Sequence, residues 1–114
     1  MQRDEVVIRD IVNAARLVLD FVNGFDKETF NYDWKTRSAV LYQLTVIGEA
    51  VKRLSKEFRA EYPQIPWSLI AGMRDNLIHG YDLIDWDEAW KTSTVDIPDL
   101  LDKIDSYIDK KAGM

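Results

Sequence analysis

Residues 39–55 read AVLYQLTVIGEAVKRLS, and this stretch decides the fold. Apolar side chains recur within it and just beyond it at alternating steps of four and three residues, at Val40, Leu44, Ile47, Val51, Leu54 and Phe58. The spacing places them on one side of a helix and predicts a long core helix over residues 34–60. Gly48 interrupts this helix at a cost of about 1 kcal/mol relative to alanine. Because no second glycine flanks it, we expect Gly48 to mark the close approach of another helix rather than a phosphate loop.

A second helical stripe precedes the core helix. It comprises Ile8, Ile11, Ala15, Val18, Val22 and Phe25, at steps of three and four residues. The pattern predicts an amphipathic helix over residues 4–23, with Gly24 as its C-terminal stop. The connecting stretch FDKETFNYDW carries aromatic residues without a long period. It indicates a loop with one short helical turn that begins at Asp26.

Prolines organise the part of the chain that follows the core helix. In YPQIPW, residues 62–67, the two prolines predict that one helix stops and another restarts. We expect the next helix over residues 67–79, ending at Gly80, with four buried side chains: Trp67, Ile70, Met73 and Leu77. The final segment begins with Asp85 and Glu88, a variant of the capping box, and continues as an apolar stripe. Pro98 should kink this last helix or divide it in two.

The succession of elements indicates an all-α protein. No β alternation, hairpin turn pair or repeat stands out along the chain. We therefore expect an antiparallel four-helix bundle with short connections that include helical turns. With 114 residues, of which 46% are hydrophobic, the chain has the size of one domain spanning 1–114.

Composition narrows the classes of function. The chain has no cysteine and one histidine, so a metal site would need mostly carboxylate ligands, and we expect neither a metal nor another cofactor. The apolar stretches fall short of the roughly 20 residues of a membrane span. The charged N-terminus, MQRDEVVIRD, is unlike a signal peptide. These observations predict a cytoplasmic protein that does not associate with membranes.

Charge restricts how the chain can contact nucleic acid. The net charge of −5 argues against a broad non-specific grip, so any contact with RNA should be local, and DNA is not an expected partner. One basic cluster lies at helical spacing: Lys52, Arg53, Lys56 and Arg59. We interpret this cluster as a solvated helix face, with a track for substrate as the alternative.

The stretch with the most chemical potential is RDNLIHGY, residues 74–81, which we call the octet. It groups Arg74, Asp75, His79 and Tyr81. If the octet is helical, Asp75 and His79 stack on one face four residues apart, and the carboxylate favours the imidazolium form. A position at the C-terminus of the helix favours the same form through the helix dipole. Arg74 would border the same cleft and remain cationic.

Arginine beside histidine suits the cleavage of an RNA phosphodiester. The neighbouring 2′-hydroxyl attacks, the histidine moves protons, and the arginine stabilises the charge that builds on the phosphoryl oxygens. One histidine is few for a reaction that works best with both a base and an acid. A twofold dimer would bring two copies of His79 and Arg74 to one cleft. We therefore expect the homodimer to be the active unit.

The octet and its flanks resemble the HepT-like branch of the HEPN superfamily. RDNLIHGY matches the Arg-x4-His-x-Tyr signature of that branch, and the likeness extends through AVLYQLTVIGEAVKRLS and YPQIPWSLIAGMRDNLIHGYDLIDWDEAW. The resemblance implies a helical metal-independent ribonuclease toxin whose motif lies at a dimer interface. It also implies a partner, a minimal nucleotidyltransferase antitoxin that inactivates the toxin by adding AMP to the motif tyrosine, which is Tyr81 by position. A bulky anionic adduct there would block the cleft and repel RNA.

Several alternatives remain open. The chain could be a non-catalytic helical subunit that binds a nucleotidyltransferase or its nucleotide, a hypothesis that the acidic composition favours and the intact octet disfavours. Tyr81 could simply cap a helix end. The tryptophans at 67, 86 and 90 are interpreted as anchors of the core or of a dimer interface rather than as platforms for bases. Glu49 and Asn76 are assigned no role.

Overall fold

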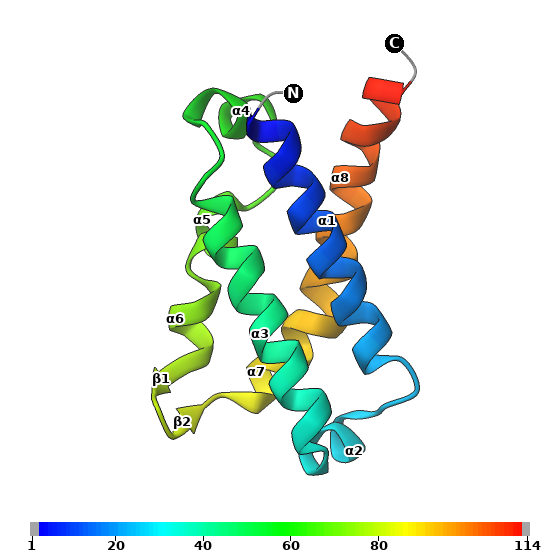
Figure 1. Cartoon of the computed structure of the whole chain (residues 1–114), viewed down its shortest axis with the longest axis vertical. Helices are drawn as coiled ribbons and strands as arrows, with labels where there is room; N and C mark the ends of the chain where they lie inside the picture. Colours follow the sequence, from blue (N-terminus) through cyan, green and yellow to red (C-terminus); the bar gives the residue numbers. More distant parts are fainter. Residues whose placement is uncertain (1–2, 113–114) are drawn as a thin grey trace.

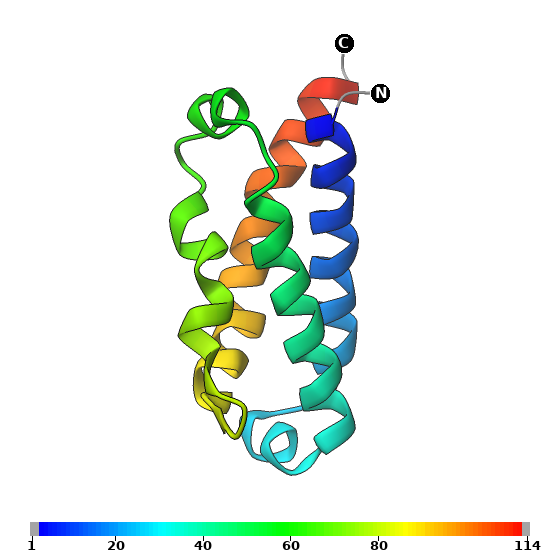
Figure 2. The same cartoon turned by 60° about the vertical axis from the view of Figure 1, so that its left-hand side comes forward.

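The computed structural model describes residues 3–112, with side chains through Ile108, and this part of the chain is mainly helical, as predicted. The long helices α1 (Arg3–Val22), α3 (Trp34–Val51) and α8 (Ile97–Ala112) run side by side, and α1 packs against both of the others (Figure 1). The short helices α5 (Trp67–Ala71) and α6 (Met73–Leu77) pack against α3 on the side away from α1 (Figure 2). The chain then passes through α7 (Trp86–Lys91) and the π-helix η1 (Thr92–Asp96) into α8. No helix of the described residues is both long enough and apolar enough to cross a bilayer.

The apolar stripes read from the sequence form the core. Every member of both stripes is buried except Phe25 and Phe58, which are partly buried and pack against the others. Gly48 lies where expected: a β-carbon built on it would sit 3.2 Å from the backbone oxygen of Ile70 on α5. The prediction of a close helix approach at Gly48 is confirmed.

The local caps of the N-terminal half are also confirmed. Helix α1 ends at Val22, and Gly24 adopts the left-handed conformation with φ of 86°. Asp26 caps α2 (Lys27–Tyr32) by accepting a hydrogen bond of 2.8 Å from the Thr29 N–H. That hydrogen bond, with a second from the Thr29 hydroxyl, holds the pKa of Asp26 below its ordinary value. The short helical turn expected after Asp26 is this α2.

The core helix is shorter than predicted. Helix α3 ends at Val51 rather than near residue 60, and a separate helix, α4 (Lys56–Glu61), follows a turn. Ser55 caps α4 through its Oγ, which accepts from the Phe58 N–H at 3.0 Å. The Asp4 carboxylate at the start of α1 accepts hydrogen bonds from the Ser55 N–H at 2.8 Å and from its hydroxyl at 2.7 Å. This contact from a distant part of the chain fixes the break, and it divides the basic cluster between the turn and α4 instead of placing it on one helix face.

The predicted helix over residues 67–79 is helical over most of its length, but it is interrupted once and ends two residues early. Gly72 separates α5 from α6, and α6 ends at Leu77, because Ile78 has an extended backbone. Residues beyond it form an antiparallel hairpin of β1 (Ile78–Gly80) and β2 (Leu83–Ile84), although no strand was expected. The Leu77 carbonyl accepts from the Asp85 N–H at 2.8 Å, which closes the base of the hairpin. The third expected helix is therefore two short ones, and its four predicted core residues are buried.

The last segment is divided, as Pro98 led us to expect. Asp85 caps α7 by accepting from the Glu88 N–H at 3.0 Å, which confirms the predicted helix start. The π-helix η1 then separates α7 from α8 just before Pro98. Proline has no N–H to donate to the carbonyl one turn earlier, so the wider turn accommodates the missing hydrogen bond.

Candidate active site

The octet lies at the junction between α6 and the hairpin. Met73 and Leu77, which are 6% and 1% exposed, anchor α6 in the core, and the polar residues Arg74, Asp75 and Asn76 between them are exposed. The hairpin then carries His79 on β1 and Tyr81 in its turn. Burial of one face of α6 thus presents the polar residues of the octet on the surface at one end of the molecule (Figure 1).

His79 occupies a β-bulge. Ile78 pairs with Ile84 and Gly80 pairs with Leu83, so two steps along β1 match one step along β2, and His79 is the extra residue. A bulge leaves its extra residue out of the ladder and redirects its side chain. His79 is exposed and forms no hydrogen bond or ion pair with the residues that the structure describes. Its imidazole is free to meet a ligand.

Asp75 pairs with Arg74 and not with His79. The Arg74 Nη1 and Asp75 Oδ1 atoms lie 3.3 Å apart, in a pair whose side chains are 49% and 78% exposed. The expected stack of Asp75 and His79 on one helix face is therefore wrong, because His79 lies two residues beyond the end of α6. For the same reason His79 does not occupy the last turn of a helix. Such an exposed ion pair is weak, so Arg74 can leave Asp75 for a phosphate.

Tyr81, the tyrosine of the octet, is almost fully exposed. It lies in the turn of the hairpin with its side chain 98% exposed, so it does not cap a helix end. It lies two residues after His79 in the chain. A reagent that modifies Tyr81 would meet no obstacle from the fold.

The three singled-out tryptophans pack as core anchors. Trp67 is 7% exposed, and its Nε1–H donates to the carbonyls of Arg59 and Tyr62. Trp86 and Trp90 are partly buried and contact the Phe30 ring, with centroids 6.4 and 5.1 Å apart. The interpretation that these three residues are structural is confirmed.

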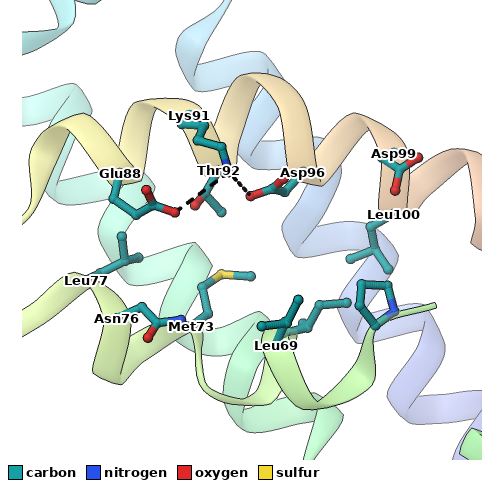
Figure 3. Close-up of a pocket in the computed structure, with 12 residues that line it drawn as sticks. Leu69, Met73, Asn76, Leu77, Glu88, Lys91, Thr92, Asp96, Asp99 and Leu100 are labelled. Atoms are coloured by element: carbon teal, nitrogen blue, oxygen red, sulfur yellow. Dashed lines mark ion pairs between the residues drawn. The ribbon is translucent and has the colours of Figure 1, made fainter.

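A cavity of about 230 Å³ opens beside the octet, between α5–α6 and the η1–α8 segment (Figure 3). Part of its lining is apolar, with Met73 on α6 and Leu100 on α8 on opposite sides of the cavity. Its rim carries three carboxylates, and the Lys91 ammonium pairs with two of them, Glu88 at 4.0 Å and Asp96 at 3.6 Å. The excess of negative charge makes this cavity a poor site for RNA phosphates, and neither Arg74 nor His79 lines it.

No metal centre is apparent in residues 3–112: they hold no group of three or more histidine, cysteine or acidic side chains placed to bind an ion. The octet itself presents a guanidinium, which is paired with the Asp75 carboxylate, and an exposed imidazole. Those groups suit an anionic ligand such as a phosphodiester.

Comparison with known proteins decides the family. The model of the family described as Ribonuclease HepT-like matches residues 11–107. The chain belongs to the ribonuclease HepT-like family. A protein named Probable ribonuclease HepT from Thermococcus cleftensis is 41% identical to it over 86% of this chain and 89% of its own length. No solved structure matches the chain significantly.

Two further relatives support the assignment, and both are provisionally named as RNases. One, from Methanocaldococcus jannaschii, is 38% identical over 87% of this chain and 82% of its own length. The other, from Caldanaerobacter subterraneus, is 34% identical over 97% of this chain and 99% of its own length. The likeness to HepT-like proteins thus covers the octet, the hairpin and the helices that carry them.

The sequence analysis missed one unusual group in this HepT-like chain. Arg37 on α3 is 8% exposed, and its guanidinium lies between two tryptophan rings, those of Trp34 and Trp86. The spacing of Trp34 and Arg37, three residues apart on one helix, is a signal that could have revealed half of this arrangement. The contribution of Trp86 depends on the packing of α7 and was not readable from local sequence.

Proposed function

We propose that this HepT-like protein is an endoribonuclease that cleaves RNA without a metal ion and is active as a homodimer. The observation that carries the proposal is the position of His79, an exposed and unpartnered imidazole on a β-bulge directly after the helix that bears Arg74. Membership of the family and the names of its relatives support RNA as the substrate.

The chemistry assigned to these residues is internal transesterification. One imidazole takes the proton of the 2′-hydroxyl, whose oxygen attacks the adjacent phosphorus. The bond from phosphorus to the 5′-oxygen breaks, and a protonated imidazole gives its proton to that oxygen. The products are a 2′,3′-cyclic phosphate and a 5′-hydroxyl. Arg74 stabilises the phosphoryl oxygens in the transition state.

The homodimer is part of the proposal, because a single protomer supplies one histidine for two proton transfers. In one protomer the octet lies on an open surface. Of its residues, Asn76 and Leu77 line the neighbouring cavity and the others do not. A twofold partner placed against the hairpins would enclose the octet and add a second His79 and Arg74. Asp75 is assigned to hold Arg74 in position in the free enzyme.

Incubation of the purified protein with total cellular RNA in EDTA tests the catalytic assignment. The unaltered chain should cleave RNA, and His79→Ala and Arg74→Ala should each lower the rate at least about 100-fold, because each removes a group that acts in the transition state. Arg9→Ala is a matched control, since Arg9 is an exposed arginine on α1 that lies outside the octet and the basic cluster. Equal cleavage by all four proteins would show that the octet is not the catalytic site.

Regulation by a minimal nucleotidyltransferase antitoxin is the second part of the proposal, supported by the resemblance and by the exposure of Tyr81. Co-expression with the nucleotidyltransferase should add one or more AMP groups to this chain and abolish cleavage, because the adduct carries negative charge beside His79. Intact-mass spectrometry of the chain measures the modification, with Tyr81→Phe as the test and Tyr32→Phe, at a tyrosine that is 82% exposed, as the control. An unchanged adduct mass in Tyr81→Phe would exclude Tyr81 as the target.

One observation favours a second candidate, a non-catalytic subunit that binds a nucleotidyltransferase or its nucleotide. Asp75 already neutralises Arg74, and the chain as a whole carries a net charge of −5. If the protein co-purifies with the nucleotidyltransferase and fails to cleave any RNA when separated from it, this candidate replaces the first.

A further inference from the structure

A buried cation lies at the same end of the molecule as the octet. The Arg37 guanidinium carbon is 4.2 Å from the centroid of the Trp34 ring and 4.6 Å from that of Trp86. Arg37 is 8% exposed, its Nε is buried without an acceptor, and its guanidinium forms no hydrogen bond or ion pair with the side chains that the structure describes. This arginine therefore carries a charge that no carboxylate of the described chain balances.

The acidic residues closest in the chain to these rings are already engaged. Asp33 caps α3 by accepting from the Thr36 N–H at 2.9 Å, Asp85 caps α7, and Asp87 pairs with Lys27 at 3.4 Å. A buried charge without a counterion is unfavourable, and cation–π contacts offset only part of that cost. The two rings instead hold the guanidinium in one orientation. A planar, fixed and unpaired guanidinium is suited to bind a phosphate.

Trp34 adds an open aromatic surface to the fixed cation. Trp34 begins α3 and is 72% exposed, although its ring packs against the buried Arg37. Indole rings that are both exposed and held by a neighbouring arginine are well suited to stack on unpaired bases. The pair thus combines the two groups that recognise a nucleotide: a flat ring for the base and a guanidinium for the phosphate.

The packing connects this pair to the octet. Trp86 directly follows Asp85, and the Asp85 N–H donates to the carbonyl of Leu77. The hairpin that carries His79 begins at the residue after Leu77. The hairpin, α2 and the first turns of α3 and α7 lie together at one end of the molecule in both views (Figures 1 and 2). The first turn of α3, which carries Trp34, therefore lies at the same end of the molecule as the hairpin.

We propose that Trp34 and Arg37 form a nucleotide-binding subsite, in which a base flanking the cleaved bond stacks on Trp34 and a phosphate binds Arg37. The inference rests on the proposed ribonuclease function. Because the protein carries a net charge of −5, its contact with RNA should be local, and the subsite provides such a contact at this end of the molecule. It also distinguishes Trp34 from the three core tryptophans, since they are buried or partly buried.

Binding of a short single-stranded RNA with 2′-O-methyl groups tests the subsite independently of cleavage, because such RNA cannot undergo attack by the 2′-oxygen. Fluorescence anisotropy of labelled RNA should show that Trp34→Ala weakens binding at least about fivefold, with Trp34→Phe retaining most of the affinity. Arg37→Gln should weaken binding. The plot of log affinity against log salt concentration has a negative slope, and this variant should make it less steep by roughly 0.7, the value for one phosphate contact on a single strand. Arg9→Gln, at an exposed arginine of α1 outside the basic cluster, is the matched control and should change neither.

The outcomes separate this inference from the proposed function. Unchanged affinity in Trp34→Ala overturns the subsite even if Arg37→Gln fails to fold, and cleavage of RNA by that variant would leave the proposed function standing. Loss of binding in Trp34→Ala by a protein that never cleaves RNA would keep the subsite and remove the ribonuclease assignment. Dissociation of an oligomer by Trp34→Ala, seen by sedimentation with no RNA present, would assign the pair to an interface between copies and overturn the inference.

Discussion

At the scale of single residues, Gly48 shows how a missing side chain sets the distance between two helices. A β-carbon at this position would lie 3.2 Å from the Ile70 oxygen and 3.6 Å from the Ala71 oxygen. Both atoms belong to the backbone of α5, so they cannot move away as the end of a flexible side chain can. Gly48 in the IGEA stretch thus allows α5 to pack closely against α3, and the position of α5 in turn sets the positions of α6 and the octet.

Gly48→Val should lower the free energy of unfolding by roughly 2 kcal/mol, because the larger side chain must displace the backbone of α5. Ser38→Val is a matched control on the exposed face of α3, where the same residue type should change stability by less than about 0.5 kcal/mol. Urea unfolding monitored by circular dichroism measures both. Equal losses in the two variants would mean that helix propensity and not the contact with α5 explains the glycine.

At the scale of elements, local signals in the sequence were reliable and long-range ones were not. The N-cap of α2, the glycine after α1 and the start of α7 were predictable because their hydrogen bonds join residues three or four apart. The end of α3 depends on Asp4, which is 51 residues from Ser55. The hairpin depends on pairing of Ile78 with Ile84 and on the hydrogen bond from Asp85 to Leu77, neither of which gives a periodic pattern.

The contact between Asp4 and Ser55 gives a prediction about α4. Asp4→Ala removes two charge-assisted hydrogen bonds and should destabilise the protein by roughly 2 kcal/mol, while amides of α4 exchange faster than those of α3. Asp10→Ala, at an exposed aspartate of the same helix, should leave both quantities nearly unchanged. Hydrogen exchange measured by NMR reports each amide separately. Unaltered protection of the Phe58 amide in Asp4→Ala would show that α4 is held by its apolar contacts alone.

At the scale of the whole molecule, the sequence identified the residues of the candidate site but not their geometry. Arg74, His79 and Tyr81 were found because they are close in the chain, and the structure keeps them at one end of the fold. Their relation to one another changed, because a helix was expected where a bulged hairpin forms. Arg37 and Trp86 could not be grouped from sequence, since 49 residues and several elements separate them.

The proposed homodimer makes a quantitative prediction about mixed dimers. If one cleft needs a base and an acid from two copies of His79, a dimer of one unaltered and one His79→Ala chain should lose most of its activity. An equal mixture, unfolded and refolded together, should then retain about a quarter of the activity of the same total amount of unaltered protein, because about a quarter of randomly formed dimers contain two intact chains. Independent protomers would retain about half. A mixture with Arg9→Ala, refolded in parallel, should keep full activity. A linear loss with the fraction of His79→Ala would show that each protomer cleaves RNA alone.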